Sequence, residues 1–112
     1  VVSTAQELSD FAYSAALSWV PLGGGITSVE REGRDLFVSG GKPHGLLGLL
    51  SAETCVQLSF SDVAVKATIL GGRKGIAVDK ELFTHPVGER PLIDVANAAI
   101  KDVSAYLATS TG

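Results

Sequence analysis

The chain has 112 residues, of which 46% are hydrophobic, and a formal net charge of -3 at pH 7. This length predicts one domain over residues 1–112, either complete or part of a longer chain, and the acidic balance without a basic run argues against nucleic-acid binding. The single cysteine, Cys55, excludes an internal disulfide and favours a cytoplasmic location, and no apolar run is long enough to span a membrane.

A helix is predicted near the N-terminus. Ser3 and Thr4 are followed three residues later by Gln6 and Glu7, the spacing of a capping box, in which hydroxyl and carboxyl or amide groups satisfy free backbone donors. Pro21 and the glycines at 23–25 end the helix. Apolar residues recur between these limits at helical spacing, and they are Leu8, Phe11, Ala12, Ala15 and Trp19.

A first hairpin is predicted from residues 26–31 and 35–39, around Glu32 and Gly33. A three-residue loop opposes Arg31 to Asp35, whereas a two-residue loop opposes Arg31 to Arg34. Like charges that face each other across a hairpin cost stability, so the longer loop is preferred.

Residues 40–51 fit no regular period, because two pairs of leucines are interrupted by Gly48. Burial within the domain is the usual outcome for leucine. However, the glycines at 45 and 48 would weaken a short packed helix or strand. We therefore predict that at least one leucine pair contacts a partner, with Leu47 and Leu50 favoured by their helical spacing. The candidate partner-binding residues are Leu46, Leu47, Leu49 and Leu50.

A central hairpin is predicted between residues 54 and 70, where hydrophobicity alternates twice. A two-residue turn at Ser61 and Asp62 accounts for the change of parity between the two runs. It pairs Phe60 with Val63 and Leu58 with Val65, and so places all the apolar partners on one face. The opposite, wetter face then carries Cys55, Gln57, Ser59, Lys66 and Thr68.

One more strand and a second helix follow. A four-residue loop at 71–74 and a strand over 75–83 oppose Ile69 to Ile76 and Ala67 to Val78, and residues 84–89 are predicted to form a loop. Pro91 suits the first turn of a helix. The predicted fold is thus α+β, an antiparallel sheet of about five strands covered by an N-terminal and a C-terminal helix. The apolar stripe of the second helix contains Leu92, Val95, Ala96, Ala99, Val103 and Tyr106.

The residues capable of chemistry do not form a recognised motif. His44 and His85 are 41 positions apart, each beside a proline, and neither has the spacing of a metal ligand set. A dyad of Cys55 with His44 would need an accessible thiol, and Cys55 lies within a strand pattern. No cofactor or metal is therefore expected.

Three functions remain open. The first is a non-catalytic module that acts by homo-oligomerisation or as a subunit of an assembly, which the apolar composition and the leucine-rich segment favour. The second is a carrier of an apolar small molecule held between sheet and helices. The third is a small enzyme that uses His44 or His85. The candidate ligand-binding residues of the second function are Phe11, Trp19, His44, Phe60 and Val95.

Overall fold

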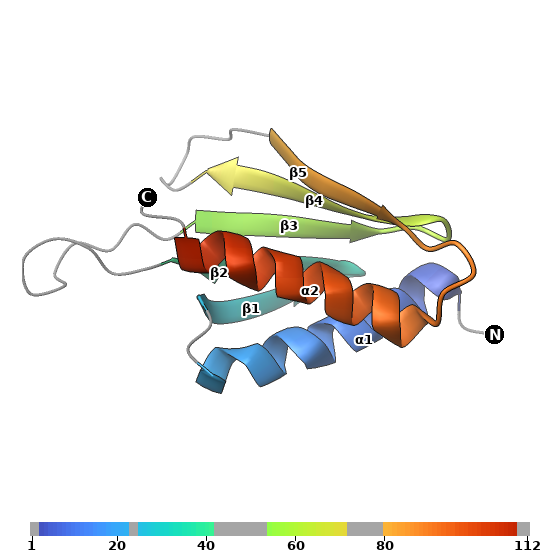
Figure 1. Cartoon of the computed structure of the whole chain (residues 1–112), viewed down its shortest axis with the longest axis horizontal. Helices are drawn as coiled ribbons and strands as arrows, with labels where there is room; N and C mark the ends of the chain where they lie inside the picture. Colours follow the sequence, from blue (N-terminus) through green and yellow to red (C-terminus); the bar gives the residue numbers. More distant parts are fainter. Residues whose placement is uncertain (1–2, 23–24, 42–53, 72–79, 110–112) are drawn as a thin grey trace, which may run out of the picture.

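The computed structural model describes residues 3–22, 25–41, 54–71 and 80–109. Within these ranges the chain forms a helix, five strands and a second helix, which confirms the predicted α+β fold (Figure 1). A short 3-10 turn, η1, follows the first helix. In chain order the elements are α1 (Thr4–Trp19), η1 (Val20–Leu22), β1 (Ile26–Glu32), β2 (Asp35–Gly40), β3 (Thr54–Phe60), β4 (Ala64–Gly71), β5 (Lys80–Pro86) and α2 (Leu92–Thr109).

The five strands form one antiparallel sheet in the order β1-β2-β3-β4-β5, and the two helices pack together on one of its faces. In Figure 1 the helices run in the same direction, with α1 beside β1 and α2 across the middle of the sheet. Contacts of β5 with either helix are sparse. The helix layer is therefore displaced toward β1 and leaves the β5 margin of the sheet less covered.

The core lies between the sheet and the helices, and the predicted alternation explains how it forms. Val56, Leu58 and Phe60 of β3 are buried beneath the helices, because alternate residues of a strand point to the same face. Small side chains at Ala12 and Ala16 of α1 are fully buried and allow close packing. The other face keeps the predicted residues: Cys55, Gln57, Ser59 and Thr68 are half-buried and Lys66 is exposed.

The start of α1 is fixed by two capping side chains. Ser3 Oγ accepts a hydrogen bond from the Gln6 N–H at 3.2 Å, which confirms the predicted cap. Asp62 Oδ1, from the turn between β3 and β4, accepts another from the Ala5 N–H at 3.1 Å. The second cap joins residues 57 positions apart, so it also docks the hairpin turn onto the helix.

The predicted register of the first hairpin is wrong. Arg31 lies opposite Leu36, because the turn occupies Gly33 and Arg34, with Gly33 at a φ of 63°. The side chain of Arg31 reaches Asp10 of α1, so its charge is paired outside the hairpin. Arg31 therefore faces neither Arg34 nor Asp35 across the hairpin, and repulsion between like charges does not set the register.

The predicted register of the central hairpin is also wrong, by two residues. Phe60 pairs with Val65 and not with Val63, since the turn residues are Asp62 and Val63. Ser61 closes this turn: its N–H donates to the Ala64 carbonyl at 3.0 Å, and its Oγ accepts from the Ala64 N–H at 3.1 Å. Val63 is 73% exposed and does not join the packed face.

The last strand ends later than predicted. β5 spans Lys80–Pro86, so the predicted loop at 84–89 starts three residues too early. Ala67 pairs with Phe83 and Ile69 with Lys80, which replaces the predicted partners Val78 and Ile76. Those two partners lie outside the described residues. An edge strand tolerates a proline whose missing N–H would point away from the neighbouring strand. Pro86 can therefore belong to β5 and still lie opposite Ala64 of β4.

Candidate interaction site at β5 and α2

The less covered margin of the sheet, at β5, carries two aromatic rings on its helix-facing side. His85 pairs with Val65 and Phe83 pairs with Ala67, so all four residues share one face. Val65 and Ala67 are fully buried, but Phe83 and His85 are only half-buried. The difference arises because α2 packs against β4 and makes few contacts with β5.

Phe83 and His85 form a fixed pair with a carboxylate of α2. Their ring centroids are 4.5 Å apart with an interplanar angle of 31°. His85 Nε2 lies 2.7 Å from Asp102 Oδ2, within hydrogen-bonding distance. The side chains of His85 and Asp102 are 27% and 51% exposed, respectively. This hydrogen bond therefore joins the edge strand to the helix at a place that solvent and a partner can reach.

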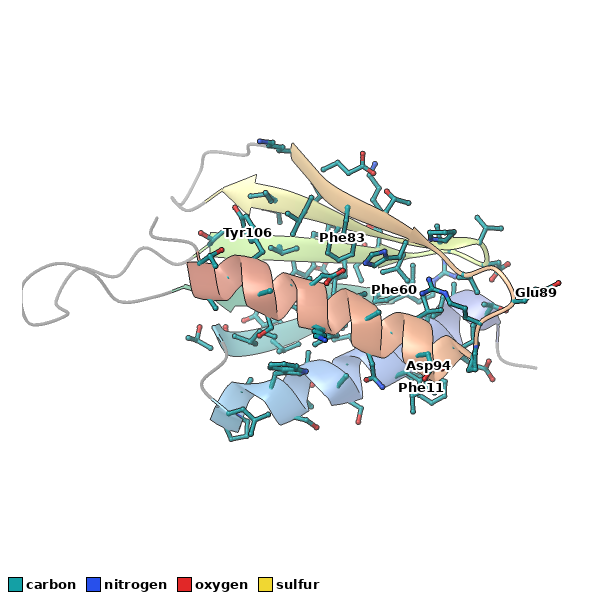
Figure 2. The ribbon with its side chains drawn as sticks, in the orientation of Figure 1. Phe11, Phe60, Phe83, Glu89, Asp94 and Tyr106 are labelled. Carbon is teal, nitrogen blue, oxygen red and sulfur yellow. The ribbon has the colours of Figure 1, made fainter. Side chains whose placement is uncertain are left out.

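Tyr106 adds a third aromatic side chain, one helical turn beyond Asp102. It is half-buried and packs against the core. Figure 2 shows Phe83 on β5 and Tyr106 on α2 along the same side of that helix. We call Phe83, His85, Asp102 and Tyr106 the β5–α2 cluster.

The β5–α2 cluster has two chemical capabilities. Its half-exposed aromatic surface can pack against an apolar group, with the polar atoms of His85 and Asp102 beside it. An imidazole oriented by a carboxylate can also move a proton. Within the described residues, no three His, Cys, Asp or Glu side chains are grouped closely enough to hold a metal ion.

A second polar contact, at the β1 edge, has a structural role. Arg31 pairs with Asp10 of α1 at 2.5 Å, and its guanidinium lies 5.5 Å from the centre of the Tyr13 ring. The hydrogen bonds that Asp10 accepts from Arg31, and then from Gln6, hold the pKa of that carboxyl below its usual value. These contacts fasten α1 to β1.

The predicted ligand-binding residues are distributed over different environments. Phe60 and Val95 belong to the packed core, and Trp19 packs at its periphery. Phe11 is 38% exposed. The ligand cavity thus stays a prediction.

The structure does not test the remaining predicted site residues. His44 and the candidate partner-binding residues Leu46, Leu47, Leu49 and Leu50 lie outside the described residues. Cys55, the other member of the dyad considered for His44, is half-buried on β3.

The sequence did not identify Asp102 as a functional residue. Position 102 lies outside the apolar stripe predicted for the second helix, which agrees with the exposure of Asp102. Its partner, His85, is 17 positions away on another element. No spacing rule connects a residue of an edge strand with one turn of a later helix, so only the tertiary structure reveals the pair.

Comparisons of the chain with protein families, curated proteins and solved structures find no match. Among the described helices, none combines the length and the apolar character that crossing a bilayer requires.

Proposed function

We propose that this chain is a non-catalytic interaction module that forms a homo-oligomer or serves as a subunit of an assembly, and that the β5–α2 cluster provides the contact. One observation carries the proposal. The Phe83 ring packs against His85, which is hydrogen-bonded to Asp102, in a half-exposed position beyond the helix layer.

A side chain that is already held in place lowers the entropic cost of association. A flexible side chain loses rotamer freedom when a partner binds, whereas a ring already held by its neighbours loses less. Phenylalanine is also among the aromatic residues that are enriched in interfaces relative to the rest of the surface. Phe83 meets both conditions, and His85 and Asp102 supply polar atoms for the rim of the contact.

The opposite face of the sheet is a weaker candidate. Its chemistry is mostly polar: Gln57 donates a hydrogen bond to Asp35 at 3.3 Å, and Lys66 is exposed. An antiparallel sheet commonly leaves one such face in water. The leucine pairs of residues 46–50 remain a second predicted contact, on the sequence argument alone.

The experiment compares Phe83→Ser with Phe11→Ser. Both remove a partly exposed phenyl ring, but Phe11 lies on α1, away from the β5–α2 cluster. Sedimentation velocity measures the oligomeric state, and circular dichroism verifies that each variant is folded. We expect Phe83→Ser to shift the wild-type oligomer to monomer and Phe11→Ser to leave it unchanged. A monomeric wild type, or equal effects of the two variants, would contradict self-association through this cluster.

Acid–base chemistry at His85 is a second candidate, favoured by its hydrogen bond to Asp102. A native mass spectrum separates these possibilities. Stoichiometric retention of a small molecule by wild type, lost in His85→Ala, favours the enzyme, whereas an oligomer without a bound molecule favours the interaction module.

A further inference from the structure

The outer edge of β5 is the feature from which a further property follows. The strand order leaves β5 paired with β4 on one side only, within the described part of the chain. An unpaired edge offers backbone donors and acceptors to any extended segment, and this makes edge strands common sites of strand addition and aggregation. The backbone groups that point outward from β5 decide whether such pairing can occur.

The hydrogen bonds between β4 and β5 identify those groups. The Val87 N–H donates to the Val63 carbonyl at 2.8 Å. In the register that pairs Val65 with His85, Val63 lies opposite Val87, so these two residues form a hydrogen-bonded pair. Hydrogen-bonded and non-hydrogen-bonded pairs alternate along an antiparallel ladder. The backbone groups of His85 consequently point to β4, and those of Thr84 and Pro86 point to the free edge.

Pro86 offers an incoming strand neither a donor nor a free acceptor. Proline has no backbone N–H. The Pro86 carbonyl accepts a hydrogen bond from Arg90 Nη2 at 2.8 Å, so its oxygen is already engaged by the chain itself. A partner strand would have to displace the Arg90 guanidinium and would still find no donor at this position.

The other neighbour of Thr84 along this edge is also unsuitable for pairing. The register shifts between Ala67 and Thr68, whose partners are Phe83 and Glu81, so Leu82 is an extra residue in β5. Such a bulge bends and twists the strand and disrupts the regular spacing of its backbone groups. Thr84 therefore remains as an isolated position between a bulge and a proline, and a regular ladder needs several consecutive positions.

We propose that Pro86 and Arg90, together with the bulge at Leu82, close the outer edge of β5 to strand addition. A second copy of the chain or an extended peptide then cannot continue the sheet at β5. This inference does not depend on the proposed function, since it concerns backbone pairing and not side-chain contact.

The test restores the missing donor and frees the acceptor. The double variant Pro86→Val with Arg90→Ala gives the edge an N–H at position 86 and an unengaged carbonyl. Glu89→Ala is the matched control, because it removes an exposed charge from the same loop and leaves the edge unaltered. Sedimentation velocity and thioflavin T fluorescence are measured at equal concentrations, and circular dichroism reports folding. A second double variant, Pro86→Thr with Arg90→Ala, is measured in parallel.

We expect the double variants to be folded and to form species heavier than the wild type, with increased thioflavin T fluorescence, and the control to match the wild type. Folded double variants that sediment like the wild type and bind no dye would overturn the proposal. If both double variants fail to fold, Pro86 and Arg90 are required for the fold itself, and their role as edge protection is likewise rejected.

Discussion

Replacing Gly40 by alanine is expected to destabilise the fold strongly, because Gly40 lies against another backbone segment. A Cβ atom at position 40 would be 1.8 Å from the Gly25 carbonyl oxygen, whereas real Cβ contacts are essentially never shorter than 3.0 Å. The carbonyl would have to move by roughly 1.2 Å. It cannot retreat freely, since Gly25, at a φ of 103°, packs against the backbone of Ala108 in α2. The same carbonyl also accepts the Gly41 N–H at 3.0 Å.

The expected cost follows from these contacts. Overpacking of a well-packed region costs about 1 to 3 kcal/mol, and loss of the hydrogen bond to Gly41 costs about 0.5 to 1.5 kcal/mol. Gly40→Ala should therefore lower the free energy of unfolding by about 2 to 4 kcal/mol, a large part of the stability of a small domain. Urea denaturation followed by circular dichroism measures this change.

The matched control is Gly33→Ala. Gly33 has a φ of 63°, but a Cβ atom there would meet nothing within 4 Å. Only the backbone conformation is then penalised, at about 1 to 2 kcal/mol. If Gly40→Ala destabilises the fold no more than Gly33→Ala does, the close approach of Gly40 at the end of β2 to Gly25 before β1 is refuted.

Two further perturbations test the core and the helix–sheet contact. Leu58→Ala should cost about 2 to 5 kcal/mol, because Leu58 is fully buried beneath the helices, whereas Gln57→Ala on the other face should cost much less; similar urea midpoints would contradict the assigned faces. The lowered pKa of Asp10 means that its charged form favours the folded state, so its contribution is present above the pKa of the unfolded carboxyl and is lost as pH falls through the lower folded value. Asp10→Asn should accordingly be less stable than the wild type near pH 6, and the difference in thermal midpoint should shrink as pH falls below about 4 and disappear only below the lowered pKa of Asp10; a difference that stays constant as pH falls would exclude the charge of Asp10 as its cause.

The alternation of apolar residues was sufficient to predict which faces of β3 and β4 are buried but not which residues are paired. A shift of the β3–β4 turn by one position moves every pair by two residues, as between Phe60 and Val65, and this leaves the faces unchanged. The side chain of Ser61 decides the turn by accepting hydrogen bonds within it. The periodicity of apolar residues carries no information about such a local hydrogen bond.

Neither the extent of β5 nor the β5–α2 cluster could be predicted from the sequence, because both depend on tertiary contacts. Thr84, His85 and Pro86 have the composition of a loop, and they are part of a strand because β4 pairs with them on one side. The contact of His85 with Asp102 then depends on where the helix layer is placed over the sheet. Capping at Ser3 was predictable because its partner, Gln6, is only three residues away.

The oligomeric state of the wild-type chain tests the central claim most directly. Native mass spectrometry, at concentrations checked by sedimentation equilibrium, should find a multiple of the 11.5 kDa chain mass. Dissociation of that species by Phe83→Ser, with its circular dichroism spectrum retained, is the predicted result. A wild type that remains at 11.5 kDa throughout the concentration range would contradict self-association through the β5–α2 cluster.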